Sequence, residues 1–277
     1  MKFTPVTLPD NVNVSKTHPL IELLWLIGGF VVLIGVLFLL LGFTTDLAVS
    51  KTPIEIETWI GELGLNEFPG TENEALNNRL ELLLEQLPSY SPLRRYQFHV
   101  HLADSDEVNA IALPGGNIVV FAGLLKEIQS ENELAMVLAH ELGHFAHRDH
   151  LRGLGRGLGV AVASVLLFGE NSATSSVISN ALLTFNRRYS QQQETAADQF
   201  GIDLLTKRYG HAGGAIDFFS RINTNDEQAS YLLATHPHPQ ARIAALHQRI
   251  KNRHYQMKAL DPLHADLRKI NTSEQIN

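Results

Sequence analysis

A long apolar run near the N-terminus constrains the fold of this chain more than any other feature of its sequence. From Leu23 to Phe43, 21 consecutive residues carry no charge. At about 1.5 Å of rise per helical residue, such a run matches a bilayer hydrocarbon core of roughly 30 Å. We therefore expect one transmembrane helix at residues 23–43, preceded by a short N-terminal segment at residues 1–22.

A cleaved signal peptide is the alternative interpretation of this run. The apolar region of a signal peptide usually has about 7–15 residues, whereas this run is longer and follows a polar lead of 22 residues. Ala48-Val49-Ser50 could serve as a cleavage site. The length of the run favours an uncleaved anchor.

The lysines around the run predict its orientation. Lys2 and Lys16 precede it, and Lys51 follows it among several acidic residues. Because cytoplasmic flanks carry the excess of Lys and Arg, we expect residues 1–22 in the cytoplasm and the part beyond the helix outside it. In a bacterium, this describes a single-pass inner-membrane protein whose C-terminal domain faces the periplasm.

The motif His140-Glu141-Leu142-Gly143-His144 carries the most specific chemistry. Two histidines four residues apart project from one face of a helix, so both imidazoles can reach one Zn²⁺. Glu141, beside them, can accept the proton of an attacking water. Since the chain has no cysteine, any metal must be held by His and carboxylate side chains.

The residues around this motif predict a helix from Ser130 to about His150. Ser130 and Glu133 have the spacing of a capping box, and apolar residues recur at helical intervals for the buried face. These apolar residues are Leu134, Val137, Leu138, Leu142 and Phe145. An apolar helix face would not otherwise bury a His-Glu-His cluster, so metal ligation explains the histidines better than a core role.

The remaining segments have a mixed α and β pattern. We expect a connector at residues 44–70, a helix from about Glu72 to Leu87, and a half-buried strand over residues 96–102. Two histidines on the outward face of that strand are best explained as solvated. The apolar segment 157–169 is short for a membrane span, which favours a core helix or a membrane-surface helix over a second crossing.

A hairpin is predicted between Asn109 and Phe121. Two short apolar strands flank Pro-Gly-Gly at residues 114–116, a tight-turn signal. A strand with a free edge near the metal helix can pair with an extended peptide through its backbone. The candidates for this contact with a substrate are Asn117, Ile118 and Val119. A purely structural hairpin explains the same pattern equally well.

Two histidines do not complete a catalytic zinc site, which has three protein ligands and a water. His150, ten residues after His140, would complete the pattern H-E-x-x-H-x-x-G-x-x-H. That pattern needs Gly at position 147, where this chain has His147. Glu194 is the second candidate, because Glu194 and Asp198 stand four apart on one face of a later helix. Asp198 could then accept the remaining N–H of a ligand His.

Five segments together resemble the gluzincin metalloproteases of the HtpX and CAAX-prenyl-protease type. They lie in the expected order between residues 72 and 250, at Asn109–Gly116, Gly123–Leu125, His140–His144, Glu194–Asp198 and Thr235–Ile243. The set is far more specific than H-E-x-x-H alone. The chain departs from the family at Gln191, where Arg is usual, and in its single clear membrane span, where those proteases have several.

The resemblance implies a zinc site and a role for each residue in it. The implied ligands of one Zn²⁺ per chain are His140, His144 and Glu194. Glu141 is then catalytic, and Asp198 supports a ligand His. The resemblance also puts His236 at the cleft, as our candidate donor to the oxyanion of the reaction, and Arg242 is expected to hold the acidic groups around Asp198.

The sequence as a whole predicts a mainly α fold with a small β-sheet (α+β): a zincin-like gluzincin metalloprotease domain at residues 71–277, preceded by one transmembrane helix. We expect zinc-dependent hydrolysis of polypeptides, including misfolded envelope proteins, beside a lipid bilayer. A formal charge of -7 without a basic patch argues against nucleic acid as a partner. A non-proteolytic zinc adaptor or holdase is the alternative, which the intact Glu141 disfavours. The hairpin edge disfavours a hydrolase of non-peptide substrates.

Overall fold

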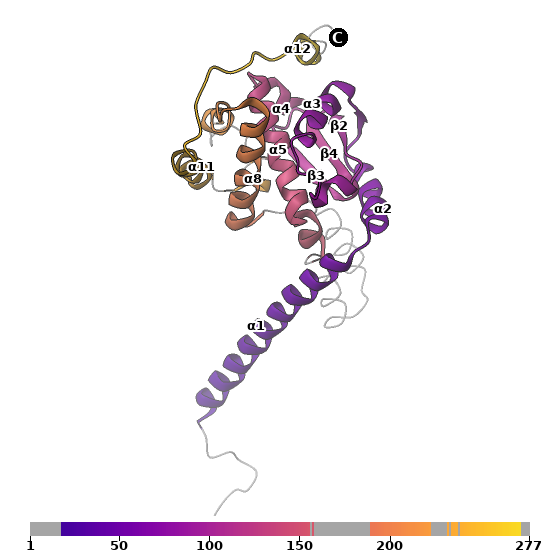
Figure 1. Ribbon diagram of the computed structural model, residues 1–277. Helices are drawn as coiled ribbons and strands as arrows, with labels where there is room; N and C mark the ends of the chain where they lie inside the picture. The colour runs from indigo at the N-terminus through magenta and orange to yellow at the C-terminus, as the bar shows by residue number, and fades with distance from the viewer. Residues whose placement is uncertain are drawn as a thin grey trace, which may run out of the picture. The chain divides into compact units, whose positions relative to one another are not determined.

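The fold combines many helices with one four-stranded sheet (Figure 1). The computed structural model describes residues 18–155, 157, 189–222, 232, 234–237 and 239–272. The chain divides into two units, Met1–Thr44 and Thr45–Asn277. The predicted mainly α fold with a small sheet is confirmed.

Helix α1, Pro19–Lys51, contains the predicted transmembrane run. Within the described residues, it is the one helix long and apolar enough to cross a membrane. The side chains of its apolar stretch are exposed, among them Trp25 (79%) and Leu39 (72%), so they build no protein core. The predicted helix is confirmed, and its insertion into a membrane stays a prediction.

The segment 44–70 differs from the connector expected there, because most of it is helical. α1 continues through its first residues, and α2 spans Ile54–Leu65. α2 turns Gly61 toward the hairpin turn, where a Cβ would come within 2.0 Å of the Pro114 carbonyl oxygen. Close packing of this helix on a distant turn explains why its own sequence did not reveal it.

The sheet has the strand order β1-β2-β4-β3. Its strands are β1 Gly70–Glu72, β2 His99–Ala103, β3 Ala110–Leu113 and β4 Asn117–Phe121. β2 and β4 are parallel, whereas β1 and β3 run antiparallel to their neighbours. The predicted hairpin is confirmed: η2, Pro114–Gly116, joins β3 to β4, and Gly115 and Gly116 adopt φ values of 77° and 99°, which favour glycine.

Both faces of the sheet are buried at β4. Alternate residues of β4 point to opposite sides, so Ile118 and Val120 join the main core while Val119 and Phe121 join a smaller cluster. Helix α3, Glu74–Leu84, lies within the helix predicted there and packs in the main core. Its buried residues are Leu76, Leu80 and Leu83.

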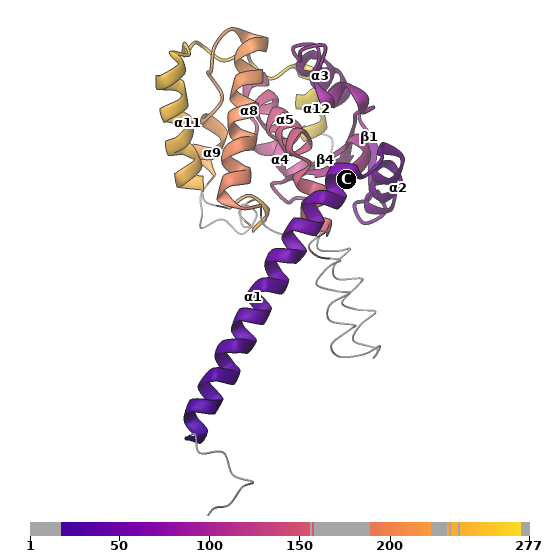
Figure 2. The same cartoon turned by 60° about the horizontal axis from the view of Figure 1, so that its bottom comes forward.

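Helices α5, Glu131–His147, and α8, Gln191–Tyr209, lie side by side (Figure 1, Figure 2). They approach so closely that a Cβ on Gly143 would come within 2.7 Å of the Ala197 Cα. The second helix has two small residues, Ala196 and Ala197, in this region. Ala197 is fully buried at the contact, whereas its neighbour Ala196 is only partly buried.

The remaining described elements surround this pair of helices. They are η1 (Pro92–Arg95), α4 (Ala122–Glu127), α9 (Asp217–Arg221), α11 (Pro239–Arg253) and α12 (Ala265–Thr272). The apolar segment 157–169, with its alternatives of core helix, surface helix or second crossing, lies outside the described residues except for residue 157.

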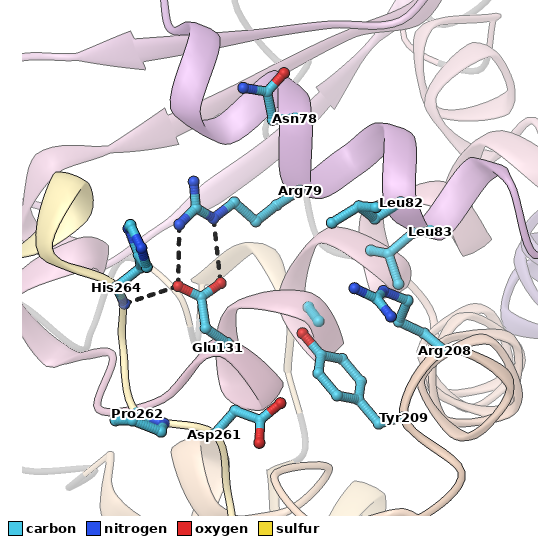
Figure 3. Close-up of a pocket in the computed structure, with 11 residues that line it drawn as sticks. Asn78, Arg79, Leu82, Leu83, Glu131, Arg208, Tyr209, Asp261, Pro262 and His264 are labelled. Atoms are coloured by element: carbon cyan, nitrogen blue, oxygen red, sulfur yellow. Dashed lines mark hydrogen bonds and ion pairs between the residues drawn. The ribbon is translucent and has the colours of Figure 1, made fainter.

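The start of α5 is held by an ion-pair network beside a cavity of about 230 Å³. Figure 3 shows Arg79 of α3 facing Glu131, whose carboxylate accepts from its Nε and Nη2, each at 3.1 Å. Arg79 also donates to Asp266 of α12 at 2.6 Å. The network therefore ties α3 and the C-terminal helix to the first turn of α5.

Candidate metal centre

The predicted metal-binding motif lies in the C-terminal half of α5. Ser130 caps this helix and accepts a hydrogen bond from Glu133 N at 3.2 Å, as expected. The Glu133 carboxylate instead accepts from the Gln129 backbone N–H, so only half of the capping box forms. The helix places His140 and His144 on one face, and both are buried.

Helix α8 brings carboxylates to that face. Ser190 and Gln193 form a complete capping box at its start, which fixes its first turn. Glu194 in that turn is buried, and its Oε1 lies 3.5 Å from His144 Nε2. One turn later, Asp198 Oδ1 lies 2.8 Å from His140 Nδ1. The structure thus brings together the two helices that the spacing of their residues singled out.

Four donor atoms converge where the helices meet. They belong to His140, His144, Glu194 and His236, and all lie within 4.8 Å of one another. His140 Nε2 is 3.1 Å from His144 Nε2 and 3.2 Å from His236 Nδ1. That His236 nitrogen is also 3.2 Å from Glu194 Oε1. The cluster could hold a metal ion, and His236, expected only as a donor to the oxyanion, lies among the potential ligands.

Each of the two motif histidines, His140 and His144, is oriented by a carboxylate on its other nitrogen. Asp198 accepts from His140 Nδ1, and Asp149 Oδ2 lies 3.1 Å from His144 Nδ1. With Nδ1 donating to a carboxylate, the Nε2 lone pair of each ring remains for a metal. Arg242 donates to both oxygens of Asp198, at 2.7 and 2.8 Å.

The charges around the cluster hold its carboxylates ionised. Burial alone would raise the pKa of Glu194, but the charges of His236 and Arg242 outweigh it and hold that pKa well below its usual range. Burial would likewise raise the pKa of Asp198, but Arg242 lowers it. Burial and the Arg242 charge lower the pKa of His140, which favours the neutral ring that binds metals.

The pKa of His144 shifts in the opposite direction to that of His140. Burial lowers its pKa, but hydrogen bonds with Asp149 and Glu194 outweigh burial and raise that pKa to about 9. The metal-free ring therefore carries a proton at neutral pH. Since a ligand imidazole must be neutral, metal binding at this ring would release a proton.

The centre is closed by the residues around it. Glu141 is 2% exposed, and its Oε1 lies 3.9 Å from His236 Nε2. Its Oε2 has no hydrogen-bond partner within the described part of the chain. The cavity beside it, lined in part by Ala110, Val137 and Phe219, measures about 10 Å³, which is room for about one water. Within the described residues, this space is too small for a polypeptide.

The structure corrects the assignment of Asn117, Ile118 and Val119 as peptide-pairing residues. They lie in β4, whose two sides pair with β2 and β3, so their backbone has no free edge. Among the described strands, β3 is the one of this hairpin that lies at an edge of the sheet, and its Ala110 carbonyl oxygen lies 3.4 Å from His236 Nε2. The sequence indicated the right hairpin. Which of its strands lies at the edge depends on β2, the preceding strand, which pairs with β4 rather than with β3.

His150 and His147 are not among the potential ligands. The His150 ring lies against Phe145, with ring centroids 4.7 Å apart, and neither of its nitrogens has a hydrogen-bond partner in the described structure. The His147 ring turns away, with its Nδ1 2.8 Å from the Gly143 carbonyl oxygen. Of the two candidates for the third ligand, Glu194 lies in the cluster and His150 does not. The strand histidines, His99 and His101, also lie outside the cluster.

Sequence reasoning missed Asp149, Gln193 and Tyr189. Gln193 Nε2 donates to Asp149 Oδ1 at 2.8 Å, and the Tyr189 ring stacks on His144 with centroids 3.8 Å apart. A carboxylate five residues after the second motif His was a usable signal for Asp149, and the spacing from Ser190 was one for Gln193. Nothing in the sequence singles out Tyr189.

The residues of this centre lie in a stretch that is similar to known peptidases. The profile of peptidase family M48 matches residues 73–250. The beta-barrel assembly-enhancing protease of Escherichia coli is 29% identical over 234 residues, which cover 77% of this chain and 47% of that protein.

Two further relatives match shorter stretches. The mitochondrial metalloendopeptidase OMA1 of Schizosaccharomyces pombe is 28% identical over 171 residues, 60% of this chain and 50% of its own length. The metalloprotease YcaL of Escherichia coli is 31% identical over 159 residues, 53% of this chain and 59% of its own length. The chain thus spans about half the length of the relatives it matches.

Proposed function

Because this chain belongs to peptidase family M48, we propose that it is a membrane-anchored, zinc-dependent metalloendopeptidase with Glu141 as general base. One observation carries the proposal: the buried Glu141 carboxylate stands beside a cluster of His and carboxylate donors, and one of its oxygens has no other partner within the described residues. A buried charge without a partner is costly. A water between Glu141 and a metal would supply the missing hydrogen bond.

The donor set suits zinc. Zn²⁺ is usually held tetrahedrally by His nitrogens at about 2.0–2.1 Å, which puts the donor atoms about 3.3 Å apart. The atoms of His140, His144 and Glu194 that face one another are 3.1, 3.5 and 3.6 Å apart. When bound, zinc would polarise the scissile carbonyl and lower the pKa of a water in the site to about 7.

The protein's own groups would move the protons and hold the ligands in place. Glu141 accepts the proton of the attacking water and passes it to the leaving amine, first as base and then as acid. Asp198 and Asp149 keep the Nε2 atoms of His140 and His144 directed at the metal. These carboxylates therefore act on the reaction through the ligands rather than on the substrate.

His236 would change place during the reaction. A catalytic zinc site keeps one position open for water, whereas four protein donors converge in the closed structure. We infer that His236 leaves the cluster when water and substrate enter, and that it then donates a hydrogen bond to the oxyanion. Its ring already faces β3 and Glu141, at 3.4 and 3.9 Å. Losing such a donor typically costs about 2.7–4 kcal/mol of barrier.

The substrate backbone would pair with β3. Phe121 N donates to Asn109 O at 3.1 Å, so by the alternation of an antiparallel ladder Ala110 and Ala112 turn their N–H and C=O groups to the other edge. An extended peptide on that edge gains main-chain hydrogen bonds whatever its sequence. Ala112→Pro removes one outward N–H, and edge positions tolerate Pro, so the variant should raise KM for polypeptides more than it lowers kcat.

The substrates we propose are misfolded proteins of the bacterial envelope. Helix α1 is long and apolar enough to anchor the chain in a membrane, and the Lys distribution around it favours a domain that faces the periplasm. The name of one relative, the beta-barrel assembly-enhancing protease, supports a function among envelope proteins.

A cleavage experiment with purified full-length protein tests the proposal. Wild type and Glu141→Gln are incubated in detergent with an unfolded and a native envelope protein, with and without a chelator. Wild type should cleave the unfolded protein in a chelator-sensitive way, and Glu141→Gln should lower kcat by about 10²–10⁴-fold while binding the same amount of zinc. Glu127→Gln, which changes an exposed carboxylate of α4, should keep wild-type activity.

Two outcomes would redirect the assignment. Cleavage retained by Glu141→Gln refutes its role as base. If wild type and Glu141→Gln both keep the unfolded protein soluble but neither cuts it, the chain is a zinc-binding holdase or adaptor. This is the alternative function for the same fold.

A further inference from the structure

Helix α5 ends in a residue type that is unusual at a left-handed C-cap. Its C-cap is Arg148, in the left-handed conformation with φ 54° and ψ 33°. Glycine usually takes this position, because an L side chain crowds the following carbonyl there. Within the described residues, only Arg148 and His254 have a positive φ without being glycine. An interaction of the Arg148 side chain must therefore favour a conformation that its own backbone disfavours.

The Arg148 guanidinium supplies that interaction, because it is fixed at three points on the junction between α1 and α2. It donates to the carbonyl oxygen of Val49, to the carbonyl oxygen of Thr52 at 2.9 Å, and to the Glu57 carboxylate. The last carbonyls of a helix lack intrahelical partners, so the guanidinium also caps the end of α1. Glu57 is fully buried and also accepts from Tyr96 OH at 2.9 Å.

The left-handed turn determines where the next residue points. Asp149 folds back so that its Oδ2 lies 3.1 Å from His144 Nδ1 and its Oδ1 accepts from Gln193 Nε2 at 2.8 Å. Gln193 directly precedes Glu194. One carboxylate therefore orients a potential ligand on α5 and holds the first turn of α8 beside it.

We propose that Arg148 is a positioning residue of the metal centre. Its three contacts hold the left-handed turn, the turn places Asp149, and Asp149 orients His144. The metal affinity of the protease thereby depends on the α1–α2 junction, although no atom of that junction is among the four potential ligands. The proposal rests on the proposed zinc site and adds to it a control that lies outside the catalytic motif.

A purely structural role for Arg148 predicts something different. In that case, its charge only compensates the buried Glu57, and its loss lowers stability without changing the metal site. Thermal stability alone does not separate the two roles. Zinc affinity does, when it is measured together with the melting temperature of the metal-free protein.

The test compares zinc affinities of full-length variants in detergent, by competition with a chromophoric chelator. Arg148→Ala removes the contacts that hold the left-handed turn, and alanine disfavours that turn as arginine does. The turn should therefore relax, and zinc affinity should fall about 10-fold or more, in the range typical of lost outer partners. Arg148→Gly also removes the anchor but accepts the left-handed turn freely, so its loss should be smaller. Asp149→Asn should lower zinc affinity about 10–100-fold.

A double-variant cycle decides whether Arg148 acts through Asp149. If it does, Arg148→Ala causes little further loss in an Asp149→Asn background, because coupled residues are not additive. The proposal would be overturned if the fold-losses of zinc affinity in the two single variants multiply in the double variant. It would also be overturned if every Arg148 variant binds zinc as tightly as wild type. Should Arg148→Ala fail to fold because Glu57 is left unpaired, Glu57→Gln/Arg148→Ala and Glu57→Gln/Arg148→Gly carry the same comparison. Wild-type protein that binds no zinc would instead overturn the proposed function itself.

Discussion

Gly143 of α5 lies directly against Ala197 of α8, where a Cβ on Gly143 would come within 2.7 Å of the Ala197 Cα. Main-chain atoms cannot give way as the end of a flexible side chain can, so an added methyl group has to push the two helices apart. These helices carry the two halves of the metal centre, with His140 and His144 on one and Glu194 on the other. The spacing of the helices therefore sets the spacing of the ligands.

Gly143→Ala should weaken both the fold and zinc binding. Overpacking of this kind costs about 1–3 kcal/mol of stability, and the displaced Glu194 should lower zinc affinity as well. The measurements are chemical denaturation of the metal-free protein and chelator competition. Gly153→Ala is the matched control, because a Cβ there has nothing within 4 Å. Equal zinc affinity in the two variants would contradict the link between helix spacing and ligand spacing.

Asp198→Asn should lower zinc affinity about 10–100-fold, because Asp198 orients His140 and is held by Arg242. The same helix supplies a control. Asp203 accepts from Arg249 Nε at 2.8 Å and from Tyr255 OH at 2.7 Å, away from the metal centre. Asp203→Asn should therefore lower the melting temperature but leave the chelator competition unchanged. A similar loss of zinc affinity in both variants would assign the effect to α8 as a whole.

His150 should make stability depend on pH. Burial lowers its pKa to about 3, whereas an unfolded His titrates near about 6.5. Between these values, the unfolded chain binds a proton that the folded protein excludes, so stability falls as the pH drops from about 6.5 toward 3, by up to about 1.4 kcal/mol per pH unit. His150→Leu should show a smaller slope in denaturant titrations of the metal-free protein over this range.

His247→Ala provides the comparison for that slope, since His247 lies on the exposed side of α11. It should keep the wild-type dependence on pH. If His150→Leu and His247→Ala have the same slope, the proton excluded on folding belongs to another group.

Chelation should destabilise the wild-type protein. A ligand that binds only the folded state at 100 times its Kd stabilises that state by about 2.7 kcal/mol. A chelator should therefore lower the melting temperature of wild type, and re-addition of zinc should restore it. His140→Ala removes one of the potential ligands, so its melting temperature should respond much less to zinc. An equal response would show that zinc binds elsewhere in the chain.

Local patterns in the sequence predicted much of this structure. The capping residue Ser130 and the apolar spacing predicted the start and the face of α5, and the pair Glu194 and Asp198 identified its partner helix. The resemblance to gluzincin metalloproteases is confirmed by the family match over residues 73–250. Each of these inferences depends on residues within a few turns of one another, where sequence spacing determines geometry.

The predictions that differed depend on contacts that the local sequence does not specify. Asn117–Val119 could be assigned to a strand but not to the interior of the sheet, because the preceding strand, β2, pairs in parallel with β4 rather than with its sequence neighbour β3. Asp149 escaped notice because the turn that directs it back begins with an arginine rather than a glycine. Its side chain is held by Val49, Thr52 and Glu57, which are close to residue 148 only in the fold.

The small size of the cavity beside Glu141, about 10 Å³, has a consequence for kinetics. If every substrate must wait for the same opening movement, the wait rather than bond cleavage limits turnover. An ester and an amide of otherwise identical sequence would then be hydrolysed at nearly the same maximal rate, although the ester is chemically the more labile. A large excess for the ester would mean that the centre opens faster than it reacts.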